Sequence, residues 1–181
     1  QALPTSAPTA TATITPVFFF MIRRPPRSTP LPTPEPVLRI DSGDTALFNG
    51  DYDLARELYL SAFNDTTDNA VKAAALWGLG RTELTAGNYQ LALEKLNTLT
   101  SEYAASTYSA RAYFLMGQAY FNLGYYQLSA DAYNTYLTRV PGVLDAYVQE
   151  YRGDALNEIK DYGGALTAYN AALTAPRLDD G

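Results

Sequence analysis

The chain of 181 residues contains no cysteine and no histidine. Without cysteine it has no disulfide bonds and no thiolate metal ligands. Without histidine it lacks the commonest general base and the commonest metal ligand. Zinc sites built from these two residue types are therefore excluded, and only carboxylates are left for acid–base chemistry. We expect neither a metal ion nor a cofactor.

Positive charge is scarce after the first forty residues. Residues 1–40 hold four arginines and one glutamate, whereas the whole chain carries a net charge of −6, so residues 41–181 carry −9. An acidic globular part repels the phosphate backbone of DNA and RNA. We therefore expect no nucleic-acid partner.

Residues 1–36 are dominated by Pro, Thr, Ala and Ser, which predicts a disordered linker because dense prolines interrupt helices. The apolar run Val17–Ile22 is too short to cross a bilayer, which needs about 20 residues, so we expect no transmembrane segment. The stretch FFFMIRRPPRSTP resembles translated sequencing adapter, and part of this segment is either such an artefact or ordinary linker. Thr/Pro-rich spacers often follow the anchor or signal of exported bacterial proteins, which favours an extracytoplasmic, cell-envelope location.

A repeat begins near Val37, where the composition changes to Ala, Leu and Tyr. Four segments superpose: NGDYDLARELY, AGNYQLALEKL, LGYYQLSADAY and IKDYGGALTAY. Each has a glycine nine positions before the shared tyrosine, a small residue three positions after it, and a large residue four positions later. The glycines are Gly43, Gly80, Gly117 and Gly153; the tyrosines are Tyr52, Tyr89, Tyr126 and Tyr162; the small residues are Ala55, Ala92, Ser129 and Ala165; the large residues are Tyr59, Leu96, Tyr133 and Tyr169.

The spacing within each unit predicts two helices joined by a short turn, because residues three and four apart share one helix face. The recurring glycines fall inside the first helices, where glycine costs roughly 1 kcal/mol relative to alanine. We interpret them as notches that allow close approach by the second helix, whose Ala or Ser faces the gap. The turns are marked by residues that accept left-handed backbone: Gly50-Asp51, Gly87-Asn88, Gly124 and Lys160-Asp161.

This pattern resembles the tetratricopeptide repeat, most closely at LWGLGRTELTAGNYQLALEKL and AYFLMGQAYFNLGYYQLSADAY. The resemblance implies an all-α fold: a right-handed α-solenoid of four helix hairpins over residues 37–179, with repeats at about 37–69, 73–106, 110–143 and 146–179. The period exceeds the usual 34 residues or so, as in solenoids of bacterial cell-envelope proteins. More narrowly, DTALFNGDYDLARELY and RVPGVLDAYVQEYRGDAL resemble the N-terminal helical region of soluble lytic murein transglycosylases.

The many tyrosines have two interpretations, a surface that stacks on a ligand or packing between helices. Their helical spacing favours packing, and we expect Tyr125 alone in its segment to be partly exposed. The tyrosines assigned to the core are Tyr52, Tyr89, Tyr126, Tyr133, Tyr136, Tyr162 and Tyr169.

Candidate binding residues lie on the first helix of each unit, which in a curved solenoid lines the concave side. Trp77 is either an anchor for a ligand or a filler between units. Arg81 and Arg111 either bind a carboxylate or are simply solvated or paired with Glu83 or Asp131. A ligand with apolar anchors and mixed charge would suit the groove. The family's carboxylate-clamp residues do not match these positions. The candidates are Trp77, Arg81, Arg111, Phe114, Gln118, Asn122, Tyr147, Glu150, Asp154 and Asn157.

No residue pattern indicates catalysis by this chain. Lytic transglycosylases commonly use a glutamate within a Glu-Ser pair on a separate domain, and no glutamate here precedes a serine. Glu57, Glu83 and Glu94 are expected on solvated helix surfaces. Asp154 shares one helix with its acidic neighbours, which is not the geometry of two carboxylates across a cleft. We expect no enzymatic activity.

Three functions stay open at this stage. The first is a scaffold that binds a protein, peptide or cell-wall partner in the cell envelope. The second is the non-catalytic solenoid of a peptidoglycan lytic transglycosylase, and the third is a cytoplasmic assembly adaptor. The last helix has a broad apolar face, from which we expect that further repeats or a catalytic domain follow in the natural protein.

Overall fold

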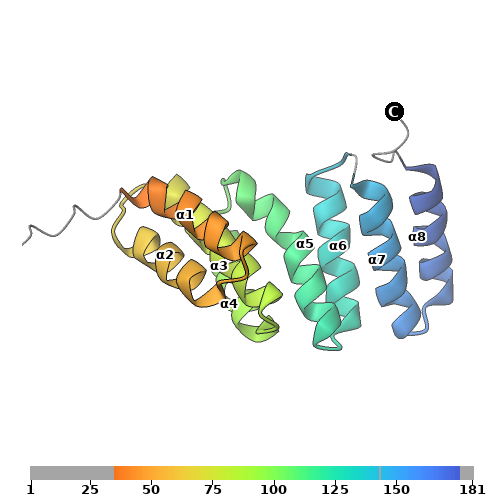
Figure 1. Cartoon of the computed structure of the whole chain (residues 1–181). Helices are drawn as coiled ribbons and strands as arrows, with labels where there is room; N and C mark the ends of the chain where they lie inside the picture. The colour runs from red at the N-terminus through yellow and green to blue at the C-terminus, as the bar shows by residue number, and fades with distance from the viewer. Residues whose placement is uncertain (1–34, 143, 176–181) are drawn as a thin grey trace, which may run out of the picture. The chain divides into compact units, whose positions relative to one another are not determined.

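The computed structural model describes residues 35–142 and 144–175, and the predicted linker lies almost wholly outside them. The described residues form eight helices and no strand. Consecutive helices pack as four hairpins, which confirms the expected all-α solenoid (Figure 1). The hairpins are α1 (Pro36–Phe48) with α2 (Tyr52–Asn64), α3 (Asn69–Thr85) with α4 (Tyr89–Glu102), α5 (Thr107–Asn122) with α6 (Tyr126–Arg139), and α7 (Asp145–Glu158) with α8 (Tyr162–Thr174).

Each helix packs against the next one along the chain. The first helices of neighbouring hairpins also touch: α1 packs on α3, and α3 packs on α5. The backbones of α5 and α7 make no comparable contact. The junction between the third and fourth hairpins therefore differs from the two before it.

The turns within the hairpins adopt the left-handed backbone that the sequence predicts. The φ angle is 79° at Gly50 and 65° at Lys160. In the first turn the amide of Asp51 donates to the carbonyl of Ala46, 2.9 Å away, and this bond closes the end of α1. The carboxylate of Asp51 accepts a bond from the amide of Leu54 at 3.1 Å, so the same residue caps the start of α2.

The recurring glycines are notches, as expected, but large side chains fill them. A Cβ atom at Gly43 would lie 2.7 Å from the ring of Tyr59, and one at Gly117 would lie 2.5 Å from the ring of Tyr133. The small residues of the second helices are buried as well, and Ser129 Oγ donates to the carbonyl of Gly117 at 2.8 Å. The large residues of the second helices therefore fill the notches, a contact that the sequence analysis does not predict.

Most of the recurring tyrosines are at least half-buried, and Tyr125 is 54% exposed as expected. The prediction is wrong for Tyr162, which is 64% exposed. Tyr126, in the preceding hairpin, packs edge-on against Phe121 with ring centroids 5.2 Å apart. The repeat places Asn157 where the third hairpin has Phe121, so Tyr162 lacks an apolar surface to cover.

Glu83 is buried, which corrects the expectation that it is solvated. Its side chain is 4% exposed and accepts a bond from Arg56 Nε at 2.6 Å and one from Asn88 at 2.9 Å. The repeat alignment indicates a buried position, because the residues equivalent to Glu83 in the first and fourth hairpins are Ala46 and Leu156, both buried. A charge at a core position needs a partner, and α2 supplies it.

Candidate partner-binding groove

The first helices of the second and third hairpins border a hollow of about 490 Å³. We name it the arginine hollow, because arginines are its charged lining residues in the described part of the chain. Its walls come from α3, α5, the end of α6 and the segment that leads into α7. It is lined by Trp77, Arg81, Arg111, Phe114, Leu115, Tyr136, Val140, Pro141, Gly142 and Leu144.

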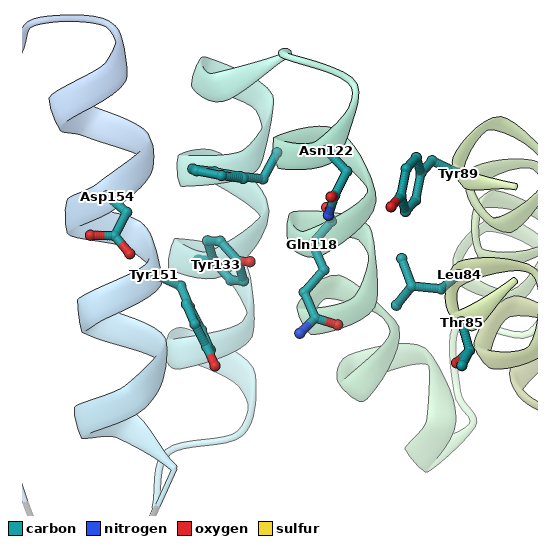
Figure 2. Close-up of a pocket in the computed structure, with 9 residues that line it drawn as sticks. Leu84, Thr85, Tyr89, Gln118, Asn122, Tyr133, Tyr151 and Asp154 are labelled. Carbon is teal, nitrogen blue, oxygen red and sulfur yellow. The ribbon is translucent and has the colours of Figure 1, made fainter. Parts of the chain in front are cut away.

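A second hollow of about 540 Å³ lies beside α5 and α7. We name it the aspartate hollow after Asp154, the charged residue in its described lining. Figure 2 shows Gln118 and Asn122 in its middle, with Tyr151 and Asp154 on one side and Leu84, Thr85 and Tyr89 on the other. Phe121 and Tyr133 complete the lining.

The two hollows follow one another along the same helices. On α3, Arg81 lines the arginine hollow, and Leu84 and Thr85 line the aspartate hollow within the next turn. On α5, Phe114 lines the first hollow and Gln118, four residues later, lines the second. Residues four apart share a helix face, so the hollows are successive parts of one groove.

A cluster of four aromatic rings separates the hollows. Phe114 packs against the rings of Tyr133, Tyr136 and Tyr151, with ring centroids 6.1, 5.6 and 6.1 Å apart. Tyr133 and Tyr151 also stack on each other at 5.9 Å. Such pairs contribute about 0.5–1.5 kcal/mol each beyond the burial of their area. The wall shared by the two hollows is therefore held firmly in place.

The two arginines of the arginine hollow have different surroundings. Arg81 pairs with Asp44 of α1 at 3.0 Å, and Asp44 also accepts a bond from the Tyr59 hydroxyl at 2.7 Å. Arg111 is exposed and makes no ion pair with any described residue. Burial raises the pKa of Tyr136, Asp145 adds to this effect, and the charge of Arg111 opposes it.

The pairings weighed from the sequence for these arginines are wrong. Glu83 binds Arg56, and Asp131 accepts a bond from Gln127 at 3.0 Å. Asp44 and Arg81 each follow a notch glycine directly, so they occupy equivalent positions on adjacent first helices. The repeat alignment therefore indicates Asp44 as the partner of Arg81.

Asp154 of the aspartate hollow is fixed by a neighbouring phenol. Its Oδ1 accepts a bond from the Tyr169 hydroxyl at 2.9 Å. Burial, together with this bond, raises the pKa of Tyr169 to about 12. Burial also raises the pKa of Tyr133, and Tyr151 and Asp154 add to that rise. The carboxylate thus presents a fixed negative charge beside the aromatic wall.

The structure brings most of the candidate residues together. Trp77 lines the arginine hollow and is also half-buried against Tyr108, at 5.9 Å between ring centroids. It therefore packs between units, and its role as an anchor for a ligand stays a prediction. Glu150 lines a smaller hollow with Asp154 and Tyr169. Tyr147 and Asn157 line neither the arginine hollow nor the aspartate hollow. The others lie in the two main hollows: Trp77, Arg81, Arg111 and Phe114 in the first, and Gln118, Asn122 and Asp154 in the second.

Sequence reasoning missed the aromatic residues that line the groove from other faces. Tyr133 and Tyr136 come from the second helix of the third hairpin and were assigned to the core alone. Tyr151 was not singled out. Its signal is its position: it stands two residues before a notch glycine, where the second hairpin has Gly78.

In residues 35–142 and 144–175, no group of three or more acidic side chains is arranged to hold a metal ion. No helix in these ranges combines the length and the apolar character needed to cross a bilayer.

Comparison with solved structures finds the same fold in proteins named MamA. MamA from Desulfovibrio magneticus RS-1, residue 41 to the end, has a TM-score of 0.68 at 20% identity, over 81% of this chain and 78% of that one. A second MamA crystal structure has a TM-score of 0.66 at 23% identity, over 77% and 72% of the two chains. At this identity the likeness concerns the fold alone.

No curated protein sequence matches the chain. The narrower resemblance to lytic transglycosylases receives no support from any of the comparisons. The tetratricopeptide repeat family model matches residues 40–107 and 114–180, which is well over half of the sequence. The chain therefore belongs to the tetratricopeptide repeat family.

Proposed function

We propose that the chain is a scaffold that binds a segment of a partner protein in the groove formed by the arginine and aspartate hollows. The observation that carries the proposal is Arg111, an exposed arginine that makes no ion pair with a described residue and lines one hollow together with Trp77 and Phe114. Trp, aromatic residues and Arg dominate the energetics of protein interfaces. A surface that only contacts water does not require Trp, Phe and Arg side chains to lie together.

The form of the groove favours a polypeptide over a small ligand. Its two hollows follow one another along α3 and α5 and are separated by one aromatic wall. A chain that passes over the wall can place one large side chain in each hollow. The linked hollows also fit the way helical repeats bind extended segments along their first helices. The proposal assigns binding, and no catalytic step, to this chain.

The test is selection of binding peptides from a random displayed library, with the folded chain as the target. Enriched peptides are then titrated into isotope-labelled protein, and the shifted amide signals are mapped. We expect shifts on α3, α5 and α7. Arg111→Ala should weaken binding by about tenfold, the loss of one charge-assisted contact. Lys95→Ala removes a charge from α4, where Lys95 pairs with Glu94, and serves as the matched control.

A different map would contradict the proposal. Another hollow, of about 390 Å³, is lined by Leu93, Tyr120, Tyr125 and Leu128 among others. If the peptides shift only the signals around that hollow, and Arg111→Ala binds as well as the original protein, the groove is not the binding site.

We also propose an extracytoplasmic location. The Thr/Pro-rich composition of residues 1–36 is its support. Fractionation of the host cells, followed by detection of the chain with an antibody, tests it. Recovery of the chain with cytosolic markers would contradict this location and favour the assembly-adaptor hypothesis.

A further inference from the structure

We infer that the partner segment carries an acidic residue and a basic residue about four or more positions apart, with a large apolar residue between them. This inference rests on the proposed function and specifies the chemistry of the partner. It follows from the different charges of the two hollows and from their fixed spacing along α5 and α7.

The third junction is built differently from the first. In the first junction the ring of Tyr59 covers both Gly43 of α1 and Gly78 of α3, and these two helices pack together. In the third junction Tyr133 covers Gly117 but meets Tyr151 at the position equivalent to Gly78. The equivalent position in the third hairpin is Leu115, where α3 and α5 still pack, whereas α5 and α7 stay out of comparable contact.

The arginine hollow supplies a site for a carboxylate beside an apolar side chain. Arg111 makes no ion pair with a described residue, and a guanidinium binds a carboxylate through two parallel hydrogen bonds. Arg81, although bound to Asp44, adds positive charge to the same lining. An acidic side chain of the partner segment can therefore pair with an arginine at this end of the groove.

The aspartate hollow supplies a site for a cation. Asp154 provides the negative charge, and the ring of Tyr151, which is 42% exposed, lies one turn earlier on the same helix. A lysine or arginine can pair with the carboxylate while it packs against a tyrosine ring. The amide of Gln118, across the hollow, can accept a further hydrogen bond (Figure 2).

The spacing of the two charges follows from helix geometry. The notch glycines Gly117 and Gly153 occupy equivalent positions on α5 and α7. Arg111 stands six residues before the first, and Asp154 stands one residue after the second. The two charged residues are therefore offset by seven positions along the helix axes. Seven positions span about 10 Å along the axes. Packed helices lie about 10 Å apart, and α5 and α7, whose backbones make no comparable contact, are separated by at least that much. The diagonal is therefore about 14 Å or more, which an extended chain covers in about four residues or more. The aromatic wall lies between the charges, and its partly exposed rings, Phe114 and Tyr151, can contact the intervening apolar side chain.

The test uses a displayed library in which a central Leu, Phe or Trp is fixed and four residues on each side are random. We expect enrichment of one acidic and one basic position about four or more residues apart. Arg111→Glu should weaken binding of the selected peptides by about tenfold or more, and Asp154→Asn by about threefold to tenfold. Lys95→Glu and Asp131→Asn match these charge changes on α4 and α6, outside both hollows, and should leave affinity unchanged.

The outcomes separate this inference from the proposed function. Peptides that shift groove signals but show no paired charges, or that ignore both Arg111→Glu and Asp154→Asn, overturn the inference and leave the binding scaffold standing. Peptides that shift no groove signal overturn both. Thermal unfolding of each variant is measured alongside, so that loss of binding is not confused with loss of fold.

Discussion

The rings of Tyr133 and Tyr151 stack with their centroids 5.9 Å apart and an angle of 27° between their planes. One ring comes from the third hairpin and the other from the fourth. The contact therefore joins two repeats at the point where their first helices do not pack together. Loss of this contact should weaken the attachment of the last hairpin to the others.

Tyr151→Ala is expected to lower the free energy of unfolding by about 1–2 kcal/mol, since it removes two aromatic contacts from a half-exposed ring. Repeats touch only their neighbours, so hydrogen exchange should accelerate mainly in α7 and α8. Tyr125→Ala is the control, because its side chain is 54% exposed and its ring pairs with that of Tyr120 at 6.5 Å, within one hairpin. Equal acceleration in all helices would contradict the local role of Tyr151.

Gly78→Ala should destabilise the protein although alanine is the better helix former. A Cβ atom at Gly78 would collide with the ring of Tyr59, which is fully buried and held by Asp44. Overpacking of this kind costs about 1–3 kcal/mol. Urea denaturation measures the change.

Gly163→Ala is the matched control, because the nearest atom to its new Cβ would be an oxygen of Asp161 at 3.8 Å. That variant should be neutral or slightly more stable. If Gly78→Ala proves as stable as Gly163→Ala, Tyr59 has room to move and the notch is not a steric requirement.

The repeat pattern predicted the fold well because each unit carries the same signals. A notch glycine, a small residue and a large residue recur at fixed spacing, and Gly50 and Lys160 mark turns with left-handed backbone. What the pattern could not predict is the pairing of individual units. The position that holds Gly78 in the second hairpin holds Leu115 in the third and Tyr151 in the fourth, and only α5 and α7 lack a comparable contact.

The candidate site was predicted in part, for a related reason. Arg111, Phe114 and Gln118 lie on a first helix, and their exposure follows from helical periodicity alone. Tyr136 comes from α6, the second helix of the third hairpin, and lines the arginine hollow. Whether a side chain of a second helix lines the groove depends on the distance between the first helices of neighbouring hairpins. No local sequence pattern encodes that distance.

Glu83→Gln should lower the free energy of unfolding by about 1.5–3 kcal/mol at pH 7, because it weakens charge-assisted bonds in a buried site. Burial alone would raise the pKa of Glu83, but the bonds from Arg56 and Asn88 outweigh it and hold the pKa below 4.5. Above pH 4.5 the glutamate is ionised in both states and its contribution is complete. As the pH falls further, protonation of the unfolded state removes that contribution.

The difference between the original protein and Glu83→Gln should therefore shrink as the pH falls below 4.5. Denaturation curves at pH 7 and pH 3.5 measure it. Glu94→Gln alters an exposed pair with Lys95 and should change stability by less than about 0.5 kcal/mol at either pH. A constant difference between pH 7 and 3.5 would show that Glu83 acts through packing and not through its charge.

Tyr169→Phe should make the protein less sensitive to alkali. Burial and the bond to Asp154 raise the pKa of Tyr169 from 10.0 to about 12. Below pH 10 the phenol is protonated in both states, and its contribution to stability is complete. Between pH 10 and 12 the unfolded chain ionises first, so stability falls as the pH rises. Phenylalanine cannot ionise, and the variant should lose less stability between pH 9 and 11.5. Tyr162→Phe, on an exposed ring of the same helix, should follow the original protein; if Tyr169→Phe does so too, its hydroxyl does not bind Asp154 in solution.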